Sequence, residues 1–281
     1  MAECFFVSDL HGKKENYNKL FSEIEKRKPG AVFMGGDLLP PFHEPQNVID
    51  FITEFLGGEM TRLKSLLQES YPRFFTILGN DDPRIFEKFI AGLEERELID
   101  YIHFKRADFN NYHIYGYSCI PPTPFFLKDW ERYDVSAFAD PGCIHPAEGS
   151  FSVDMGENIE YVNIEQDLKK LCREEDLSSS VFLFHSPPYQ TNLDRAALDG
   201  KMIDHVPLDV NIGSIAIKRF IENCSPYITL HGHVHESSSI TGEWKEKIGR
   251  TWCFSAAWSG PELALVHFPA DEPEKAERRL L

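Results

Sequence analysis

The sequence predicts an α/β protein with two sheets. In the first third of the chain, short apolar runs alternate with stretches whose apolar residues recur every three or four positions, which is the pattern of strands alternating with helices. The second half holds further strand-like runs that are expected to form a second sheet. A length of 281 residues, with 42% hydrophobic and 13% aromatic residues, is enough to bury a large core.

The first third reads as three strands, each followed by a helix. Short apolar runs predict strands at residues 5–8, 31–34 and 74–78. Helical spacing of apolar side chains covers residues 17–24 and 48–67. A third helix is expected to start at Asp82 and Pro83, because an acidic residue caps a helix well and proline is favoured at the first helical position. This order is typical of a layered α/β sheet.

The second half is less regular. The predicted elements here are strands at residues 112–117, 181–184 and 227–230 and a helix at residues 164–172. Residues 239–268 alternate in strand fashion, which predicts hairpins in the second sheet. Residues 118–160 lack periodicity and are expected to form an irregular, lid-like insert, and a charged, solvated tail is expected from residue 269. No repeat or linker divides the chain, so a single domain is expected over residues 1–281.

Bulk composition argues against several classes of protein. The formal net charge of −16 disfavours binding to long nucleic acids or anionic membranes, since their phosphate groups attract Lys and Arg. Six cysteines are scattered without a CxxC pair, as expected for reduced thiols in the cytoplasm. The first residues lack the features of a signal peptide, and no segment approaches the roughly 20 apolar residues that cross a bilayer. We therefore expect a cytoplasmic protein that binds no membrane.

A polar cluster directly follows five of the strand-like runs. The carboxyl ends of strands in an open α/β sheet meet at one edge, so side chains from these loops can converge in one crevice. The clusters supply two aspartates, one asparagine and four histidines: Asp9, His11, Asp37, Asn80, His185, His233 and His235. A helix cap, a turn or a core histidine explains the first four clusters taken singly. Three histidines within residues 231–235 serve no packing purpose, and such explanations do not account for five clusters in succession.

This set of donors indicates metal ions. Mixed oxygen and nitrogen ligands suit Mn²⁺, Fe or Zn²⁺ better than Ca²⁺, which prefers oxygen ligands. Seven ligands exceed what one catalytic ion with an open coordination position needs. They match two ions that share a bridging carboxylate. We therefore expect two divalent transition-metal ions at the ends of the strands.

The clusters resemble, in order, the signature of the calcineurin-like metallophosphoesterase superfamily, which reads D-x-H, G-D, G-N-H-D/E, H and G-H-x-H. The matching residues are Asp9-Leu10-His11, Gly36-Asp37, Gly79-Asn80-Asp81-Asp82, His185 and Gly232-His233-Val234-His235. The resemblance spans about residues 3–268. It implies a four-layer α-β-β-α sandwich of two mixed β-sheets flanked by helices, with the metals at the sheet ends.

The resemblance also implies a role for each ligand. The first metal would be held by Asp9, His11 and His235, the second by Asn80, His185 and His233, with Asp37 as the bridge. In the family's mechanism, a hydroxide held by the metals attacks the phosphorus of a phosphate ester in line. Because the nucleophile is a solvent molecule, no catalytic serine or cysteine is needed.

One departure from the family pattern concerns catalysis. Many members carry a histidine after the asparagine, where it faces the leaving group, whereas this chain has Asp81. An ionised aspartate cannot donate a proton, and general acid catalysis contributes about 10²–10⁴-fold, so a bias towards good leaving groups is expected. Two alternatives stay open: Asp81 supports a neighbouring loop, or another histidine substitutes as the acid, namely His231, His205 or His145.

The insert carries further alternatives. Aromatic side chains crowd its edge: Tyr115, Tyr117, Phe125, Phe126, Trp130 and Tyr133. These rings either stack on a flat leaving group or form a small core of the insert, and the small core is the favoured interpretation. Lys128 and Arg132 either face a phosphate group or are solvated neighbours of acidic residues.

Two functions compete. The favoured one is metal-dependent hydrolysis of a phosphodiester or a small phosphomonoester, so the expected partner is a small phosphate ester. The sequence does not determine the oligomeric state, and a homo-oligomer is one of the states it allows. The alternative is a catalytically weak or inactive protein of the same fold that acts as a protein-binding scaffold, which Asp81 also fits. The complete set of seven ligands favours the enzyme, because a scaffold has no need of them.

Overall fold

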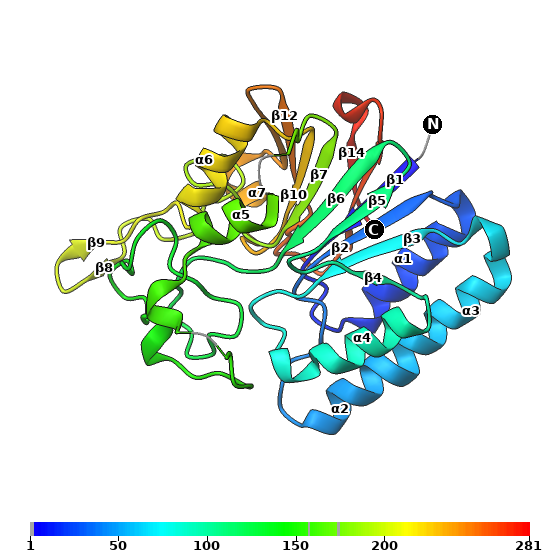
Figure 1. Cartoon of the computed structure of the whole chain (residues 1–281), viewed down its shortest axis with the longest axis horizontal. Coiled ribbons are helices and arrows are strands. Elements are labelled where there is room, and N and C mark those ends of the chain that lie inside the picture. The colour runs from blue at the N-terminus through cyan, green and yellow to red at the C-terminus, as the bar shows by residue number, and fades with distance from the viewer. Residues whose placement is uncertain (1–2, 157, 173–174) are drawn as a thin grey trace.

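The computed structural model describes residues 3–156, 158–172 and 175–281. Figure 1 shows two sheets that pack face to face, with α1 to α4 on the outer side of one sheet and α5 and α6 on the outer side of the other. Each of the two sheets has six strands, and both are mixed. The α-β-β-α sandwich expected from the sequence is therefore confirmed. No helix among the described residues combines the length and the apolar character that crossing a bilayer requires.

The first sheet has the strand order β14-β13-β1-β2-β3-β4. The bounds are β1 Glu3–Val7, β2 Ala31–Gly35, β3 Arg73–Ile77, β4 Asp100–Tyr101, β13 Ala264–Pro269 and β14 Glu277–Leu280. Strands β1 to β4 run parallel, whereas β13 is antiparallel to both β1 and β14. Strand β13 was expected in the second sheet, and this prediction is wrong because alternating side chains identify a strand but not the strand with which it pairs.

The second sheet has the order β11-β12-β10-β7-β6-β5. The bounds are β5 Arg106–Phe109, β6 Tyr112–Tyr117, β7 Ser180–Phe184, β10 Ile228–His231, β11 Lys245–Ile248 and β12 Thr251–Ser255. The four central strands run parallel, and β5 and β11 are antiparallel edges. A separate hairpin of β8 (Met202–Ile203) and β9 (Val206–Pro207) extends away from the sheets (Figure 1).

The helices cover the outer faces of the sheets. Their bounds are α1 Lys14–Arg27, α2 Pro45–Asp50, α3 Gly57–Leu67, α4 Glu87–Glu95, α5 Ile164–Cys172, α6 Ile215–Cys224 and α7 Ser237–Thr241. A π-helical stretch, Phe51–Leu56, joins α2 to α3, so the helix predicted at residues 48–67 is continuous. Short 3₁₀ turns lie at Gln68–Ser70, Arg84–Phe86, Pro146–Glu148, Ile159–Tyr161 and Pro273–Lys275.

Each central strand contributes to two cores, because successive side chains point to opposite faces of a sheet. In β1, Phe5 and Val7 pack with the helices, whereas Phe6 packs between the two sheets. Between the sheets, the rings of Phe33 and Phe75 stack with centroids 5.3 Å apart. This double burial sets the register of the strands. Because neighbouring central strands run parallel, their carboxyl ends lie at the same edge of the sheet.

Three segments near the elements differ from their predictions. Asp82 does not cap a helix, because α4 begins only at Glu87 and the Asp82 carboxylate is buried among backbone N–H groups. Residues 239–243 are not a strand, since they include the end of α7, which stops at Gly242 with a φ of 79°. The charged segment from residue 269 contains β14, whose side chains are mostly exposed while its backbone pairs with β13.

The insert divides its aromatic residues into two groups. Tyr115, Tyr117, Trp130 and Tyr133 are buried, but Tyr115, Tyr117 and Trp130 belong to the main core beside the helices and not to a separate small core of the insert. Phe125 and Phe126 are 60% and 61% exposed, so they lie outside that core. Lys128 and Arg132 are buried, so neither is the solvated residue that one alternative expected.

Candidate metal centre

Loops from both sheets meet at the carboxyl edge. Asp9 and His11 follow β1, Asp37 follows β2, Asn80 follows β3, His185 follows β7, and His233 and His235 follow β10. Among the residues that the structure describes, two groups have possible ligand atoms within 4.8 Å of one another: Asp9, His11, Asp37 and His235, and Asp37, His185 and His233. Asp37 belongs to both groups, and it is the residue that the family resemblance implies as the bridging ligand.

In the first group, atoms with lone pairs face one another. His235 Nε2 lies 3.2 Å from His11 Nε2 and 3.2 Å from Asp9 Oδ1. Two ring nitrogens at this distance have at most one proton between them, so at least one of the two presents a lone pair to the site. The backbone N–H of His233 donates to Asp9 Oδ1 over 3.0 Å, which holds the loop after β10 against the loop after β1.

The second group is built around a fully buried histidine. His185 Nδ1 donates to the Gly35 carbonyl over 2.8 Å, which directs Nε2 at Asp37 Oδ2 (3.3 Å) and Asn80 Oδ1 (3.0 Å). A second ring nitrogen bound to a carbonyl is the usual arrangement of a metal-ligating histidine. Asp37 Oδ1 accepts the backbone N–H of Asp81 over 2.8 Å, which orients the carboxylate. When His185 is neutral, the lone pair of Nε2 faces the lone pairs of these two oxygen atoms. A cation between the three atoms would remove this repulsion, so the geometry fits a cation.

The electrostatics also favour positive charge at this place. Burial alone would lower the pKa of His185, but the carboxylates of Asp37 and Asp9 raise it to about 10. Burial acts to raise the pKa of both carboxyls, yet His235 keeps that of Asp9 low and His185 keeps that of Asp37 low. A metal ion would supply the positive charge in place of protons.

The backbone is strained at four of the seven candidate ligands. Positive φ values occur at Asp9 (57°), His11 (44°), Asp37 (53°) and His233 (71°). A non-glycine residue in this region costs about 1–2 kcal/mol. Such strain persists where the surrounding structure enforces it, and it concentrates at functional sites. The strain therefore lowers the stability of the folded state, and it directs these four side chains towards the same place.

Two glycines allow the ligands to come close together. A Cβ atom on Gly79 would overlap Asp37 Oδ1 and lie 2.6 Å from His185 Nε2. One on Gly232 would lie 2.8 Å from Asp9 Oδ2. Any side chain at either position would displace a candidate ligand, so both glycines are required by close approach.

Comparisons with known proteins agree with this geometry. A family model described as calcineurin-like phosphoesterase matches residues 4–237. The chain belongs to the calcineurin-like phosphoesterase family. Among solved structures, TT1561 of Thermus thermophilus is 17% identical with a TM-score of 0.57, over 99% of this chain and 98% of that one. A dimetal phosphatase from Danio rerio is 11% identical with a TM-score of 0.51, over 95% and 91%.

At these identities, the likeness to solved structures supports the fold alone. No curated protein matches the chain. Membership of the calcineurin-like phosphoesterase family, together with the cluster of possible ligands, supports metal-dependent hydrolysis of phosphate esters in general.

Asp81 directly follows the candidate ligand Asn80, at the position where the resemblance described above expects a histidine. Its side chain is 52% exposed, and its Oδ2 lies 3.7 Å from His11 Nδ1. Its Oδ1 accepts a hydrogen bond from the Asn80 side-chain amide over 3.1 Å. Burial and the Asp37 carboxylate both raise the pKa of Asp81. The carboxylate thus contacts two candidate ligands rather than a neighbouring loop alone.

The three histidines considered as substitutes lie in different surroundings. His231 is fully buried, and its ring nitrogens are bonded to the Ser186 carbonyl (2.9 Å) and the Thr229 hydroxyl (2.8 Å). His145 lies in the insert, with Nδ1 3.3 Å from the Tyr133 hydroxyl. His205 lies in the turn of the exposed β8–β9 hairpin. The rings of His231 and His145 are thus engaged elsewhere in the fold.

Sequence reasoning missed the contribution of Asp82. This buried carboxylate accepts the backbone N–H groups of Leu38, Leu39 and Gly79, over 2.8 to 3.0 Å. Burial and the charge of Asp37 raise its pKa to about 7. Asp82 therefore fastens the loop after β2 to the loop after β3. The available signal is the final acidic residue of the G-N-H-D/E signature, which a helix cap explains equally well in the sequence alone.

Proposed function

We propose that this protein hydrolyses small phosphate esters with two divalent transition-metal ions, of Mn, Fe or Zn. The convergence of seven oxygen and nitrogen donors from five separate loops carries the proposal. Asp9, His11 and His235 would hold the first ion, Asn80, His185 and His233 would hold the second, and Asp37 would be shared by the two. When bound, the ions would lower the pKa of water and neutralise charge on the phosphoryl oxygens.

The protein's own contribution is to place the ligands before the substrate arrives. The Gly35 carbonyl fixes the ring of His185, and the His233 N–H fixes the Asp9 carboxylate. Asp82 joins the loops that carry Asp37 and Asn80. Ligands held this way need little rearrangement on metal binding, which is the preorganisation that electrostatic catalysis requires.

The substrate is a phosphodiester or a small phosphomonoester with a good leaving group. Asp81 stands where a proton donor is usual, and an ionised carboxylate cannot protonate an alkoxide. The net charge of −16 supports a small substrate over a long nucleic acid. The same Asp81 supports a second candidate, a catalytically weak scaffold that binds another protein.

One experiment separates these two functions. Metal content would be measured by elemental analysis, together with hydrolysis of a chromogenic diester and its monoester, for the wild type and Asp37→Asn. We expect about two metals per chain in the wild type, and turnover reduced by about 100-fold or more in the variant. Asp199→Asn is the matched control, because this 70% exposed carboxylate pairs with Arg195 on the surface.

A different result would favour the scaffold. If the protein binds no metal after Mn²⁺ reconstitution, and if turnover is the same for the wild type, Asp37→Asn and Asp199→Asn, the catalytic proposal is rejected.

A further inference from the structure

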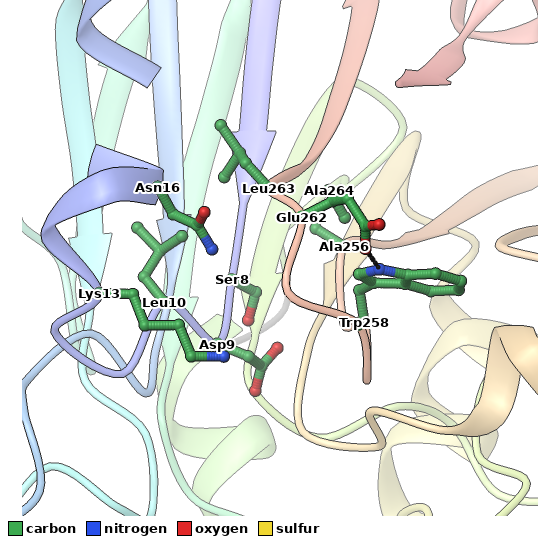
Figure 2. Close-up of a pocket in the computed structure, with 11 residues that line it drawn as sticks. Ser8, Asp9, Leu10, Lys13, Asn16, Ala256, Trp258, Glu262, Leu263 and Ala264 are labelled. Carbon is green, nitrogen blue, oxygen red and sulfur yellow. Dashed lines mark hydrogen bonds between the residues drawn. The ribbon is translucent and has the colours of Figure 1, made fainter. Parts of the chain in front are cut away.

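A small cavity adjoins the candidate metal centre on the side of Asp9. Figure 2 shows it between the end of β1, the start of α1 and the loop that joins β12 to β13. Its volume is about 10 Å³, and the polar side chains around it include Ser8, Asp9, Lys13 and Asn16. This volume corresponds to a single water molecule, since a cavity needs about 10–15 Å³ to hold one. It is too small for any part of a substrate.

Asn16 is the unusual residue of this cavity. Its side chain is on the first turns of α1, is only 5% exposed, and points into the cavity towards Ser8 and Asp9 (Figure 2). Within the described part of the chain, no residue forms a hydrogen bond with the Asn16 amide, whose nitrogen and oxygen keep a little accessible surface. Buried side-chain amides in folded proteins are nearly always hydrogen bonded to protein or to ordered water. The cavity therefore has a buried polar group that a water molecule would satisfy.

The other polar atoms complete the shell of a water molecule. The Ser8 hydroxyl donates to the Gly35 carbonyl over 3.2 Å, so it offers its lone pairs to the cavity. Asp9 directs Oδ1 at the His233 N–H and at His235 Nε2, over 3.0 and 3.2 Å. Its carboxylate has further lone pairs for a donor on the cavity side.

The walls of the cavity are held in place. The indole N–H of Trp258 donates to Glu262 over 2.9 Å, as the dashed line in Figure 2 marks. The guanidinium of Arg278 lies 5.4 Å from the same indole ring and donates to the Ser238 hydroxyl over 2.9 Å. The loop between β12 and β13 is therefore tied both to itself and to β14, which keeps the cavity small.

We propose that this cavity binds one water molecule that bridges Asn16 and Asp9. The water accepts a hydrogen from the Asn16 amide and donates its two hydrogens to the Asp9 carboxylate and the Ser8 hydroxyl. Three partners are the typical number for a buried water. Asn16 is then a positioning residue, which orients the Asp9 carboxylate from the side of the cavity. This role rests on the proposed function in so far as Asp9 is a metal ligand.

The test compares three variants in the full-length protein. Asn16→Leu keeps the size of the side chain and removes its hydrogen bonds, so we expect Mn²⁺ affinity to fall by about 10–100-fold, as for other residues behind metal ligands. Asn16→Ser keeps a hydroxyl and leaves room for a second water, so affinity within about threefold of the wild type is expected as rescue. Asn18→Leu is the control, because Asn18 is exposed on the same helix. Mn²⁺ binding would be measured by calorimetry.

A high-resolution crystal structure of the metal-free wild type tests the water site itself. A water within hydrogen-bond distance of Asn16 and Asp9 supports the proposal, and a dry cavity overturns it. Mn²⁺ affinity that is equal in Asn16→Leu, Asn18→Leu and the wild type would overturn the positioning role. If the wild type binds no Mn²⁺, the proposed function fails, and the crystal structure alone decides on the water site. It decides also if Asn16→Leu does not fold.

Discussion

Asp81 sits half-exposed at the mouth of the candidate centre, between His11 and the amide of Asn80. A carboxylate at this point can hold these two side chains, but when ionised it has no proton to give to a departing alkoxide. The cost of that loss depends on the substrate. A nitrophenolate leaves without help, whereas an alkoxide needs an acid, so the residue acts on the choice of substrate as well as on the rate.

Replacing Asp81 by histidine should therefore change the two kinds of substrate differently. We expect Asp81→His to raise kcat for a diester with an alkyl leaving group by up to about 100-fold, and to change kcat for the nitrophenyl analogue much less. Asp81→Asn is the control, since it has the same size and no titratable proton. Equal changes of kcat on both substrates would show that the position has no role in protonating the leaving group.

A residue's role could be predicted from the sequence when the neighbouring residues indicate it, and not when it depends on contacts with distant parts of the chain. The seven candidate ligands lie within five residues of the ends of apolar runs, so a local pattern was sufficient to find them. Asp82 binds backbone groups 43 and 44 residues away, and the signature residues around it do not reveal these distant partners. Asn16 resembles any other polar residue of an amphipathic helix until the cavity beside it is known.

At the scale of elements, the insert is organised around a buried ion pair. Lys128 Nζ lies 2.5 Å from Glu131 and donates to the Thr123 carbonyl over 2.8 Å. Glu131 also accepts the hydroxyl and the backbone N–H of Thr123. Burial raises the pKa of Glu131 to about 7, although Lys128 and Thr123 act to lower it. The pair fixes a segment that has few regular hydrogen bonds of its own.

Removing one partner of this pair should be costly. Lys128→Met leaves a buried carboxylate without its cation, so we expect a loss of about 3–5 kcal/mol in the free energy of unfolding at pH 7.5. The loss should shrink towards pH 5, because a pKa raised above the unfolded value of 4.5 means that the native state takes up the proton first and gains stability as the pH falls. Urea denaturation at both pH values checks this.

The controls for this variant lie within the chain. Lys128→Met combined with Glu131→Gln removes the unpaired charge and should recover much of the loss. Lys169→Met breaks an exposed pair with Glu165 and should cost less than about 1 kcal/mol. A loss in Lys128→Met no larger than in Lys169→Met would contradict a structural role of the buried pair.

The elements themselves were predicted unevenly. Strands β1, β2, β3, β6, β7 and β10 follow from short apolar runs, because burial on both faces leaves a continuous signal. Strand β13 was recognised but assigned to the wrong sheet, since its partner β1 lies more than 250 residues away in the sequence. Helix α6 was missed altogether, although Ser214 caps it by accepting the N–H of Ile217.

At the scale of the whole molecule, charge limits what can approach the centre. Twenty-nine basic and 45 acidic residues give a net charge of −16, and binding to a nucleic-acid backbone depends on Lys and Arg that displace its counterions. The protein should thus repel a long polyanion while admitting a small phosphate ester to a local cationic site.

This repulsion can be measured directly. We expect the Asp37→Asn variant, which should not hydrolyse the probe, to show no binding to a fluorescent DNA duplex at about 50 mM salt. Non-specific binding to DNA is stronger at this salt concentration than at physiological salt. Fluorescence anisotropy against a basic DNA-binding protein as the positive control checks this. Saturable binding that weakens steeply with added salt would show that a local basic surface outweighs the net charge.

The bond from the His233 N–H to Asp9 joins residues 224 positions apart. During synthesis, Asp9 leaves the ribosome long before its partner exists, and contacts of such long range close late and slowly in folding. The candidate metal centre therefore cannot assemble on a partial chain. A metal ion would bind the assembled site and not the isolated loops of one sheet. Metal binding would therefore indicate that the two sheets have packed together.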